Sequence, residues 1–193
     1  MRYRFPKEKD TPFSSYKRQK RRYEIIKPYL GQNSVGAEFG VYKGGFGEFL
    51  LPHCQKLYLV DPWYRAGPYW KTAGAVSSRV DAVRDILQVY KDDIHKGTVE
   101  VVVDFSYNFL STIKTPTFDF IYVDSCHTYE STVRELSLSL PTIKPGGYLM
   151  GDDYDPDPAS KQYGVYRAVQ EFVSCNPVKL VLVSSRQWVV RLA

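Results

Sequence analysis

Residues 118–154 read FDFIYVDSCHTYESTVRELSLSLPTIKPGGYLMGDDY, and this stretch contains two short apolar runs that each end at acidic residues. The runs and the acids that follow them are Phe118–Val123 with Asp124, and Tyr148–Met150 with Asp152 and Asp153. A helix-length segment and a Lys-Pro-Gly-Gly turn separate the runs, as parallel strands require. Ligands bind at the carboxyl edge of open α/β sheets, so the stretch predicts an active site where the three carboxylates meet.

Strand-like and helix-like segments alternate along the rest of the chain. The predicted strands are Ser34–Phe39, Leu57–Val60, Val99–Phe105, Phe118–Val123, Tyr148–Met150, Val178–Ser184 and Gln187–Leu192. The predicted helices lie at 16–30, 44–53, 78–93, 106–113, 129–141 and 163–174. This alternation predicts βαβ units, and the two residues between the last strands permit only a hairpin. We therefore predict an α/β fold: a Rossmann-like, doubly wound, seven-stranded, mostly parallel sheet with an antiparallel last strand.

Composition bounds the class of protein. The 193 residues are 44% hydrophobic and 24% charged, as in ordinary globular domains. No apolar run reaches the roughly 20 residues of a membrane span, and the N-terminus shows no secretory signal. The three cysteines are widely spaced and form no C-x-x-C motif, so we expect reduced thiols and a cytoplasmic location.

Basic residues gather near the N-terminus. Residues 1–30 hold ten Lys and Arg against three Asp and Glu, a balance of +7 within a net charge of +5. We expect 1–30 to form a basic arm and helix, and 31–193 to form the folded domain. The cluster at 17–22 is interpreted as a solvated helix face, with nucleic acid as the less favoured explanation.

A glycine-rich turn follows the first predicted strand. It reads EFGVYKGGFG from Glu38 to Gly47, and Asp61 closes the next strand 23 residues after Glu38. Glycines such as Gly40 and Gly44 let a backbone approach a ligand closely, and an acid at this distance suits ribose hydroxyls. A dinucleotide would want a third glycine and would be repelled by Glu38. The cationic ammonium of S-adenosylmethionine fits better.

Two further positions have both a functional and a structural explanation. Ser106 follows the third strand, where an adenine ring would lie, but it equally suits a helix N-cap. His127 lies three residues after Asp124 and is a candidate general base for a hydroxyl, or else a structural residue at the start of a helix.

The carboxylates favour a hard cation. Asp124, Asp152 and Asp153 at neighbouring strand ends would repel one another unless a cation, an arginine or a proton lies between them. Oxygen ligands of this kind suit Mg²⁺. The sequence therefore predicts a metal site formed by these three residues.

Five segments together resemble class I S-adenosylmethionine-dependent methyltransferases, most closely methyltransferase family 24, which is related to metal-dependent sugar O-methyltransferases. The segments are VGAEFGVYKGG, LYLVDPW, the 118–154 stretch, GVYRAVQEF and QWVVRL. The resemblance covers about residues 30–193 and implies that Glu38, Gly40 and Gly44 lie near the methionine moiety, with Asp61 on the ribose. It also implies Mg²⁺ at the three aspartates. Ser125 and Cys126 depart from the glycine and small or acidic residue of many members.

The function predicted from the sequence is Mg²⁺-assisted O-methylation of a small hydroxylated molecule, such as a sugar. The stretch Pro62–Ser78 is predicted to form a lid over this acceptor. The alternatives are an RNA methyltransferase that uses the basic N-terminus and a non-catalytic S-adenosylmethionine-binding module. The sequence leaves open whether the chain assembles as a homo-oligomer.

Overall fold

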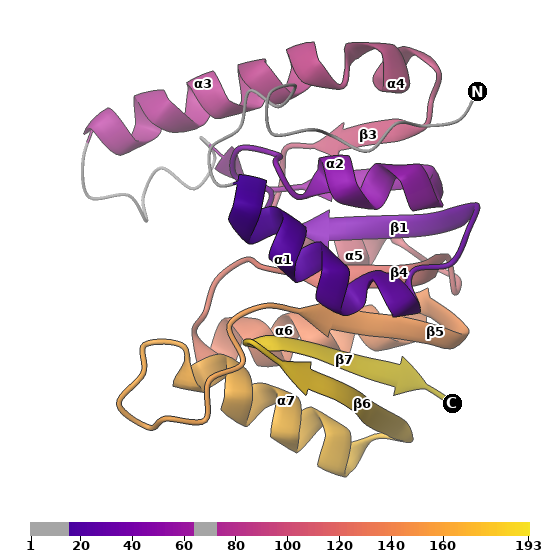
Figure 1. Cartoon of the computed structure of the whole chain (residues 1–193), viewed down its shortest axis with the longest axis vertical. Coiled ribbons are helices and arrows are strands. Elements are labelled where there is room, and N and C mark those ends of the chain that lie inside the picture. The colour runs from indigo at the N-terminus through magenta and orange to yellow at the C-terminus, as the bar shows by residue number, and fades with distance from the viewer. Residues whose placement is uncertain (1–15, 64–72) are drawn as a thin grey trace.

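The computed structural model describes residues 16–63 and 73–193, with the side chains of 73–78 excepted. A seven-stranded sheet in the order β3-β2-β1-β4-β5-β7-β6 forms the centre of the molecule (Figure 1). The strands are β1 (Ser34–Phe39), β2 (Cys54–Val60), β3 (Val99–Val102), β4 (Phe118–Val123), β5 (Ile143–Gly151), β6 (Val178–Ser184) and β7 (Gln187–Leu192). Only β7 runs antiparallel to its neighbours, which confirms the predicted fold class.

Helices cover both faces of the sheet (Figure 1). They are α1 (Tyr16–Ile26), α2 (Gly47–Leu50), α3 (Ala73–Val89), α4 (Lys91–His95), α5 (Ser106–Thr112), α6 (Tyr129–Ser139) and α7 (Tyr163–Cys175). The buried side chains of α1, α2 and α3 pack in one core cluster, and those of α5, α6 and α7 pack in the other. In the described part of the chain, no helix is both long and apolar enough to cross a membrane.

Several predicted boundaries differ from the observed ones, including the start of β2 at Cys54 and the division of the helix predicted at 78–93 into α3 and α4, and three differences have local reasons. The helix expected at 44–53 begins only at Gly47, because Gly44 adopts a φ of +77°, and its last residues form a 3₁₀ turn at Leu51–His53 that contains Pro52. β3 ends at Val102, since Asp104 instead accepts hydrogen bonds from Phe105 N and Asn108 Nδ2. β5 begins five residues early, and the Lys-Pro-Gly-Gly segment forms an irregularity within it. The predicted lid lies largely at 64–72, outside the described residues, as does the arm at 1–15.

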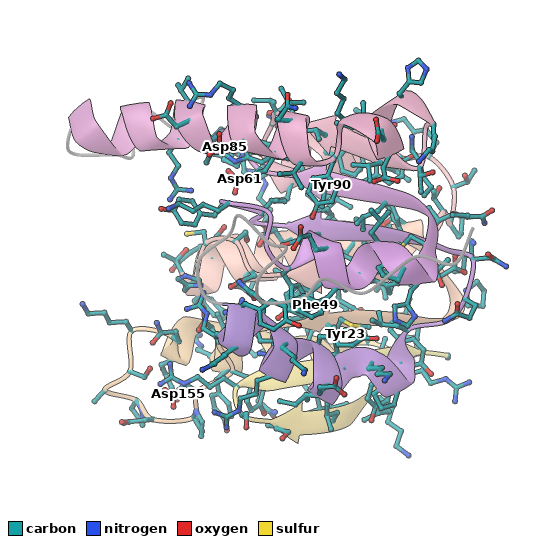
Figure 2. The ribbon with its side chains drawn as sticks, turned by 45° about the horizontal axis from the view of Figure 1, so that its top comes forward. Tyr23, Phe49, Asp61, Asp85, Tyr90 and Asp155 are labelled. Carbon is teal, nitrogen blue, oxygen red and sulfur yellow. The ribbon has the colours of Figure 1, made fainter. Side chains whose placement is uncertain are left out.

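The interpretation of the basic N-terminal cluster as a solvated face is wrong for part of α1. Tyr23 and Ile26 are buried, and the Tyr23 ring lies 5.4 Å from that of Phe49 in α2 (Figure 2). Arg22 is buried as well, at 8% exposure. An apolar stripe at helical spacing (Tyr16, Tyr23, Ile26) therefore docks α1 on the folded domain and takes Arg22 inward with it.

His53 joins α1 to the domain and makes this contact sensitive to acid. Its Nε2 lies 3.0 Å from the Tyr23 hydroxyl, and its Nδ1 lies 3.2 Å from the carbonyl oxygen of Gly31. Burial lowers the pKa of His53 below its ordinary value, so the folded state favours neutral imidazole. The contribution of His53 to stability is therefore complete above the unfolded pKa of about 6.5 and is lost as pH falls below it.

We expect the free energy of unfolding to fall between pH 7.5 and 5.5 less steeply in His53→Gln than in the wild type. One proton limits the difference in slope to about 1.4 kcal/mol per pH unit. Urea titrations at several pH values measure it. Parallel curves for the two proteins would contradict a neutral buried His53.

Candidate active site

The ends of β1, β4 and β5 meet at one edge of the sheet. Asp124 N donates to Phe39 O at 2.8 Å, and Asp152 N donates to Val123 O at 3.1 Å, so the strand pairing continues into the residues that follow each strand. Gly40, with a φ of +86°, passes so close to the backbone after Asp124 that a Cβ atom would lie 2.6 Å from Ser125 Cα. The residues of the site predicted from the sequence therefore lie at or next to this edge.

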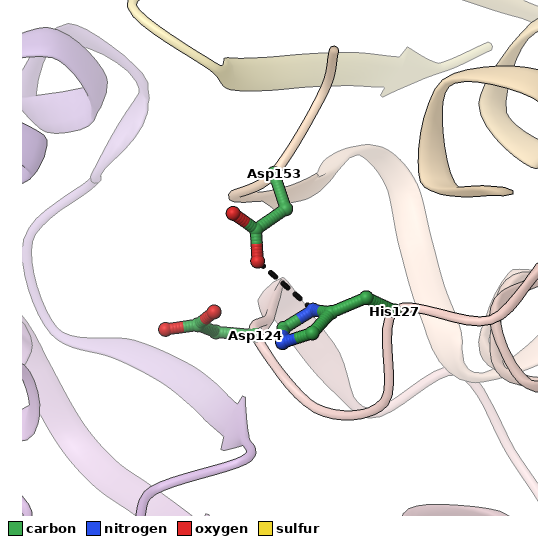
Figure 3. Close-up of side chains that lie close together, drawn as sticks. All are labelled: Asp124, His127 and Asp153. Carbon is green, nitrogen blue, oxygen red and sulfur yellow. Dashed lines mark ion pairs between the residues drawn. The ribbon is translucent and has the colours of Figure 1, made fainter. Parts of the chain in front are cut away.

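Two of the predicted carboxylates and the predicted histidine come together at this edge (Figure 3). Asp124, His127 and Asp153 each offer one ligand atom, and these atoms lie within 4.8 Å of one another. His127 Nδ1 lies 2.9 Å from Asp153 Oδ2. Two carboxylates and an imidazole are suitable ligands for a divalent cation, so the group fits a metal ion.

Asp152 lies outside this group, although sequence analysis placed it among the metal ligands. One of its oxygens contacts Arg22, and the other accepts a hydrogen bond from Gln187 Nε2 at 2.5 Å. Asp153 has a φ of +63° and its carboxylate contacts His127, so these adjacent side chains reach different partners. As a metal ligand, Asp152 stays a prediction that the geometry does not favour.

The charges of the group are strongly coupled. Burial raises the pKa of Asp124, and the positive charge of Arg22 opposes that rise. Burial acts on Asp153 in the same direction and is the largest single effect, but the hydrogen bond from His127 and the nearby positive charges together outweigh it and lower the pKa of Asp153. The same bond, followed by the nearby carboxylate charges, raises the pKa of His127. His127 and Asp153 therefore form a hydrogen-bonded dyad beside a third carboxylate.

Glu38 is buried, at 2% exposure, and is the penultimate residue of β1, just before the glycine loop. Within the described part of the chain its Oε2 has no hydrogen-bond partner. Burial, and then the charge of Asp124, raise the pKa of Glu38 well above its ordinary value. A buried acceptor without a partner is costly, so the site fits a ligand that brings a donor or a cation to Glu38.

A cavity of about 100 Å³ lies next to Glu38. Its walls come from α1 and from the glycine loop: Arg18, Gln19, Arg22, Glu38, Gly40, Val41, Tyr42, Lys43, Gly45, Phe46 and Asp124. The Tyr90 hydroxyl stabilises the loop, because it donates a hydrogen bond to the carbonyl oxygen of Gly44 at 2.8 Å. Sequence analysis predicted the loop as a ligand site and did not predict the α1 wall.

Asp61 is placed at the end of β2, beside the same loop (Figure 2). Its carboxylate accepts hydrogen bonds from Tyr42 N at 2.9 Å and from Trp63 N at 2.7 Å. Burial raises the pKa of Asp61, and these two bonds oppose the rise. Asp61 thus stabilises the conformation of the glycine loop. Each of its oxygens has a further lone pair that can accept a hydrogen bond from a ligand hydroxyl.

Ser106 does not have the N-cap role considered for it, and its role as an adenine contact stays a prediction. The N-cap of α5 is Phe105, and Ser106 makes no side-chain cap. The Ser106 hydroxyl instead donates to Glu135, whose other oxygen accepts from Ser125 Oγ at 2.5 Å. Glu135, on α6, thereby ties the segment after β4 to α5, and sequence reasoning missed it because its partners are distant in the chain.

Comparisons with known proteins identify the family and the fold. A family model described as a methyltransferase domain, family 24, matches residues 37–154. A search of curated proteins finds no sequence that matches the chain.

Solved methyltransferases share the fold at low sequence identity. The N-methyltransferase NodS from Bradyrhizobium japonicum WM9, in complex with S-adenosyl-L-homocysteine, is 18% identical with a TM-score of 0.65, and the match covers 97% of this chain and 94% of NodS. The O-methyltransferase TomG from Streptomyces achromogenes, in complex with SAM, is 18% identical with a TM-score of 0.57. The match covers 96% of this chain and 84% of TomG. A putative rRNA methylase from Clostridium thermocellum is 13% identical with a TM-score of 0.60, and the match covers 94% of this chain and 98% of the methylase.

The sheet order and the site at its edge define a class I S-adenosylmethionine-dependent methyltransferase. The chain belongs to the family of methyltransferase domains whose model it matches, since that match covers more than half of its length. It is therefore an enzyme that transfers a methyl group, and the reading as a non-catalytic module is set aside.

Proposed function

We propose that the chain transfers the methyl group of S-adenosylmethionine to a hydroxyl oxygen of a small acceptor, such as a sugar. The observation that supports this proposal is the dyad of His127 and Asp153, with 2.9 Å between Nδ1 and Oδ2. An imidazole held by a carboxylate through one nitrogen leaves the other nitrogen to accept a proton. An amine acceptor needs less help of this kind, because it reacts through its own lone pair. The fold itself does not decide, since N- and O-methyltransferases share it.

The cofactor is proposed to bind along the glycine loop. Glu38 would receive the ammonium group of the methionine moiety, Gly40 and Gly44 would allow its close approach, and Asp61 would bind the ribose. The buried Oε2 of Glu38 supports this orientation, because a cationic donor supplies the partner that it lacks. Ser106 stays a predicted adenine contact, although its hydroxyl is engaged by Glu135.

Methyl transfer then follows from the placement of the base. The C–S bond of the sulfonium breaks as the acceptor oxygen forms the new C–O bond, and the sulfur keeps the electron pair as a neutral thioether. The hydroxyl proton passes to His127, and Asp153 stabilises the imidazolium. Asp124 adds a negative charge beside the dyad.

A divalent cation, with Mg²⁺ as the first candidate, is proposed at the group of Asp124, His127 and Asp153. The two carboxylates would hold it, since Mg²⁺ is commonly bound through one or two carboxylates plus waters. When bound, it would lower the pKa of the acceptor hydroxyl.

The proposal is tested by incubating the purified chain with S-adenosylmethionine and a panel of hydroxylated molecules, each paired with its amine analogue. We expect S-adenosylhomocysteine and methylated product to form with hydroxyl acceptors. We also expect EDTA to abolish the reaction and added Mg²⁺ to restore it.

Each part of the proposal has its own contrary result. Methylation of the amines alone would overturn O-methylation, and methylation of RNA alone would favour the nucleic-acid alternative. Full activity after EDTA treatment would show that the reaction needs no metal ion, and His127 would then be the sole group proposed to activate the acceptor.

A further inference from the structure

Arg22 connects the two strand ends that carry the acidic residues of the site. Its Nη1 donates to Asp124 Oδ2 at 2.7 Å, and its Nη2 contacts Asp152 Oδ2. The side chain comes from α1, 102 residues away from Asp124 along the chain. It therefore fixes the ends of β4 and β5 relative to one another from outside the sheet.

The chemistry of the guanidinium group suits this position. Arg22 is 8% exposed, and a buried charge is tolerated only when it is paired and hydrogen-bonded. The planar fork of arginine presents two N–H directions at once, so it reaches two carboxylates that an ammonium group would not hold in the same geometry. Burial lowers the pKa of Arg22, but the negative charge of Asp124 opposes this effect, and the pKa of Arg22 is raised above its ordinary value.

We propose that Arg22 is a positioning residue for methyl transfer and acts as the fixed cation of the carboxylate cluster. This inference rests on the proposed function of the same site. Arg22 holds one oxygen of Asp124 and takes Asp152 out of reach of the group formed by Asp124, His127 and Asp153. It thus limits the place for a divalent cation to two carboxylates.

The inference makes α1 part of the catalytic unit. The matched methyltransferase segment begins at residue 37, so α1 lies outside it. Tyr23 and Ile26 dock the helix in the core, and Arg18, Gln19 and Arg22 line the cavity beside Glu38. The basic N-terminal helix therefore has a specific task at the active site.

The test compares Arg22→Ala with Arg21→Met, a matched control on the exposed side of α1, where Arg21 donates to Ser185 Oγ. We expect Arg22→Ala to lower kcat at least 100-fold and the control to keep it. Millimolar guanidinium should restore at least a tenth of the lost rate, because a free guanidinium can occupy the vacated place. Loss of a merely structural residue would not be rescued in this way.

A second readout does not depend on the acceptor. Calorimetric titration of the metal-free chain with Mn²⁺ should show at least fivefold tighter binding in Arg22→Ala than in the wild type, since one positive charge has left the cluster and Asp152 is freed. This titration stays informative if the proposed acceptor class is wrong. Arg22→Lys keeps the charge and loses the fork, so we expect reduced kcat with Mn²⁺ affinity within twofold of the wild type.

Two results would overturn the inference. One is wild-type kcat in Arg22→Ala, and the other is Mn²⁺ affinity that does not change while guanidinium fails to rescue turnover. Thermal melting identifies a variant that does not fold. If Arg22→Ala does not fold, the inference is tested with Arg22→Lys. A wild-type kcat in Arg22→Lys would then refute the need for one guanidinium group that contacts both Asp124 and Asp152.

Discussion

Replacement of His127 with alanine is expected to lower the turnover number by about 100- to 10,000-fold, the range that a positioned general base contributes. The imidazole lies beside Asp124 and Asp153, and in the proposed mechanism it takes the proton of the acceptor hydroxyl. The affinity for S-adenosylhomocysteine should change less than threefold, because the proposed cofactor contacts lie at Glu38 and Asp61. Single-turnover kinetics and calorimetry measure the two quantities separately.

His95→Ala is the matched control for this experiment. His95 is an exposed residue in the last turn of α4, away from the strand ends that form the site. We expect this variant to keep wild-type turnover. A comparable loss in both variants would point to general destabilisation, and full activity in His127→Ala would exclude His127 as the base.

Much of the fold was readable because its signals are local. The apolar run Phe118–Val123 has the length and composition of a buried strand, and it forms β4 with the bounds predicted. The two residues between the last apolar runs forced a hairpin, and β6 and β7 pair in this way. Because parallel strands deliver their carboxyl ends to one edge, Asp124 and Asp153 were expected beside each other, as the structure has them.

The rest of the site depends on contacts that local patterns do not specify. The spacing of Tyr16, Tyr23 and Ile26 on α1 was a readable sign of a packed helix, but nothing in it identifies Asp124 and Asp152 as the partners of Arg22. Asp153 also has a positive φ of +63°, and the direction of its side chain depends on this value. Such a conformation is uncommon outside glycine, so the sequence predicts it poorly.

The glycine loop yields the second large effect, through the close approach of Gly40 to the segment after β4. We expect Gly40→Ala to destabilise the fold by about 2–5 kcal/mol. Roughly 1–2 kcal/mol comes from the left-handed conformation, and about 1–3 kcal/mol comes from overpacking against a neighbour that cannot yield easily. The added Cβ would collide with the backbone of Asp124 and Ser125 and not with a flexible side chain.

Gly146→Ala separates these two causes. Gly146 has a φ of +75°, close to the +86° of Gly40, but a Cβ atom there would meet nothing within 4 Å. We therefore expect this variant to lose only about 1–2 kcal/mol, the cost of the conformation alone, and to keep its turnover. Urea unfolding and methyl transfer should be measured for both variants.

We also expect Gly40→Ala to impair catalysis in addition to stability. The shift needed to accommodate the Cβ falls on the backbone of Asp124, so Gly40→Ala should lower kcat even in the fraction that remains folded, at temperatures well below its melting transition. Equal destabilisation by the two substitutions would mean that the segment after β4 moves aside freely. The ends of β1 and β4 would then be too loosely packed against each other to hold Asp124 in a fixed position beside the glycine loop.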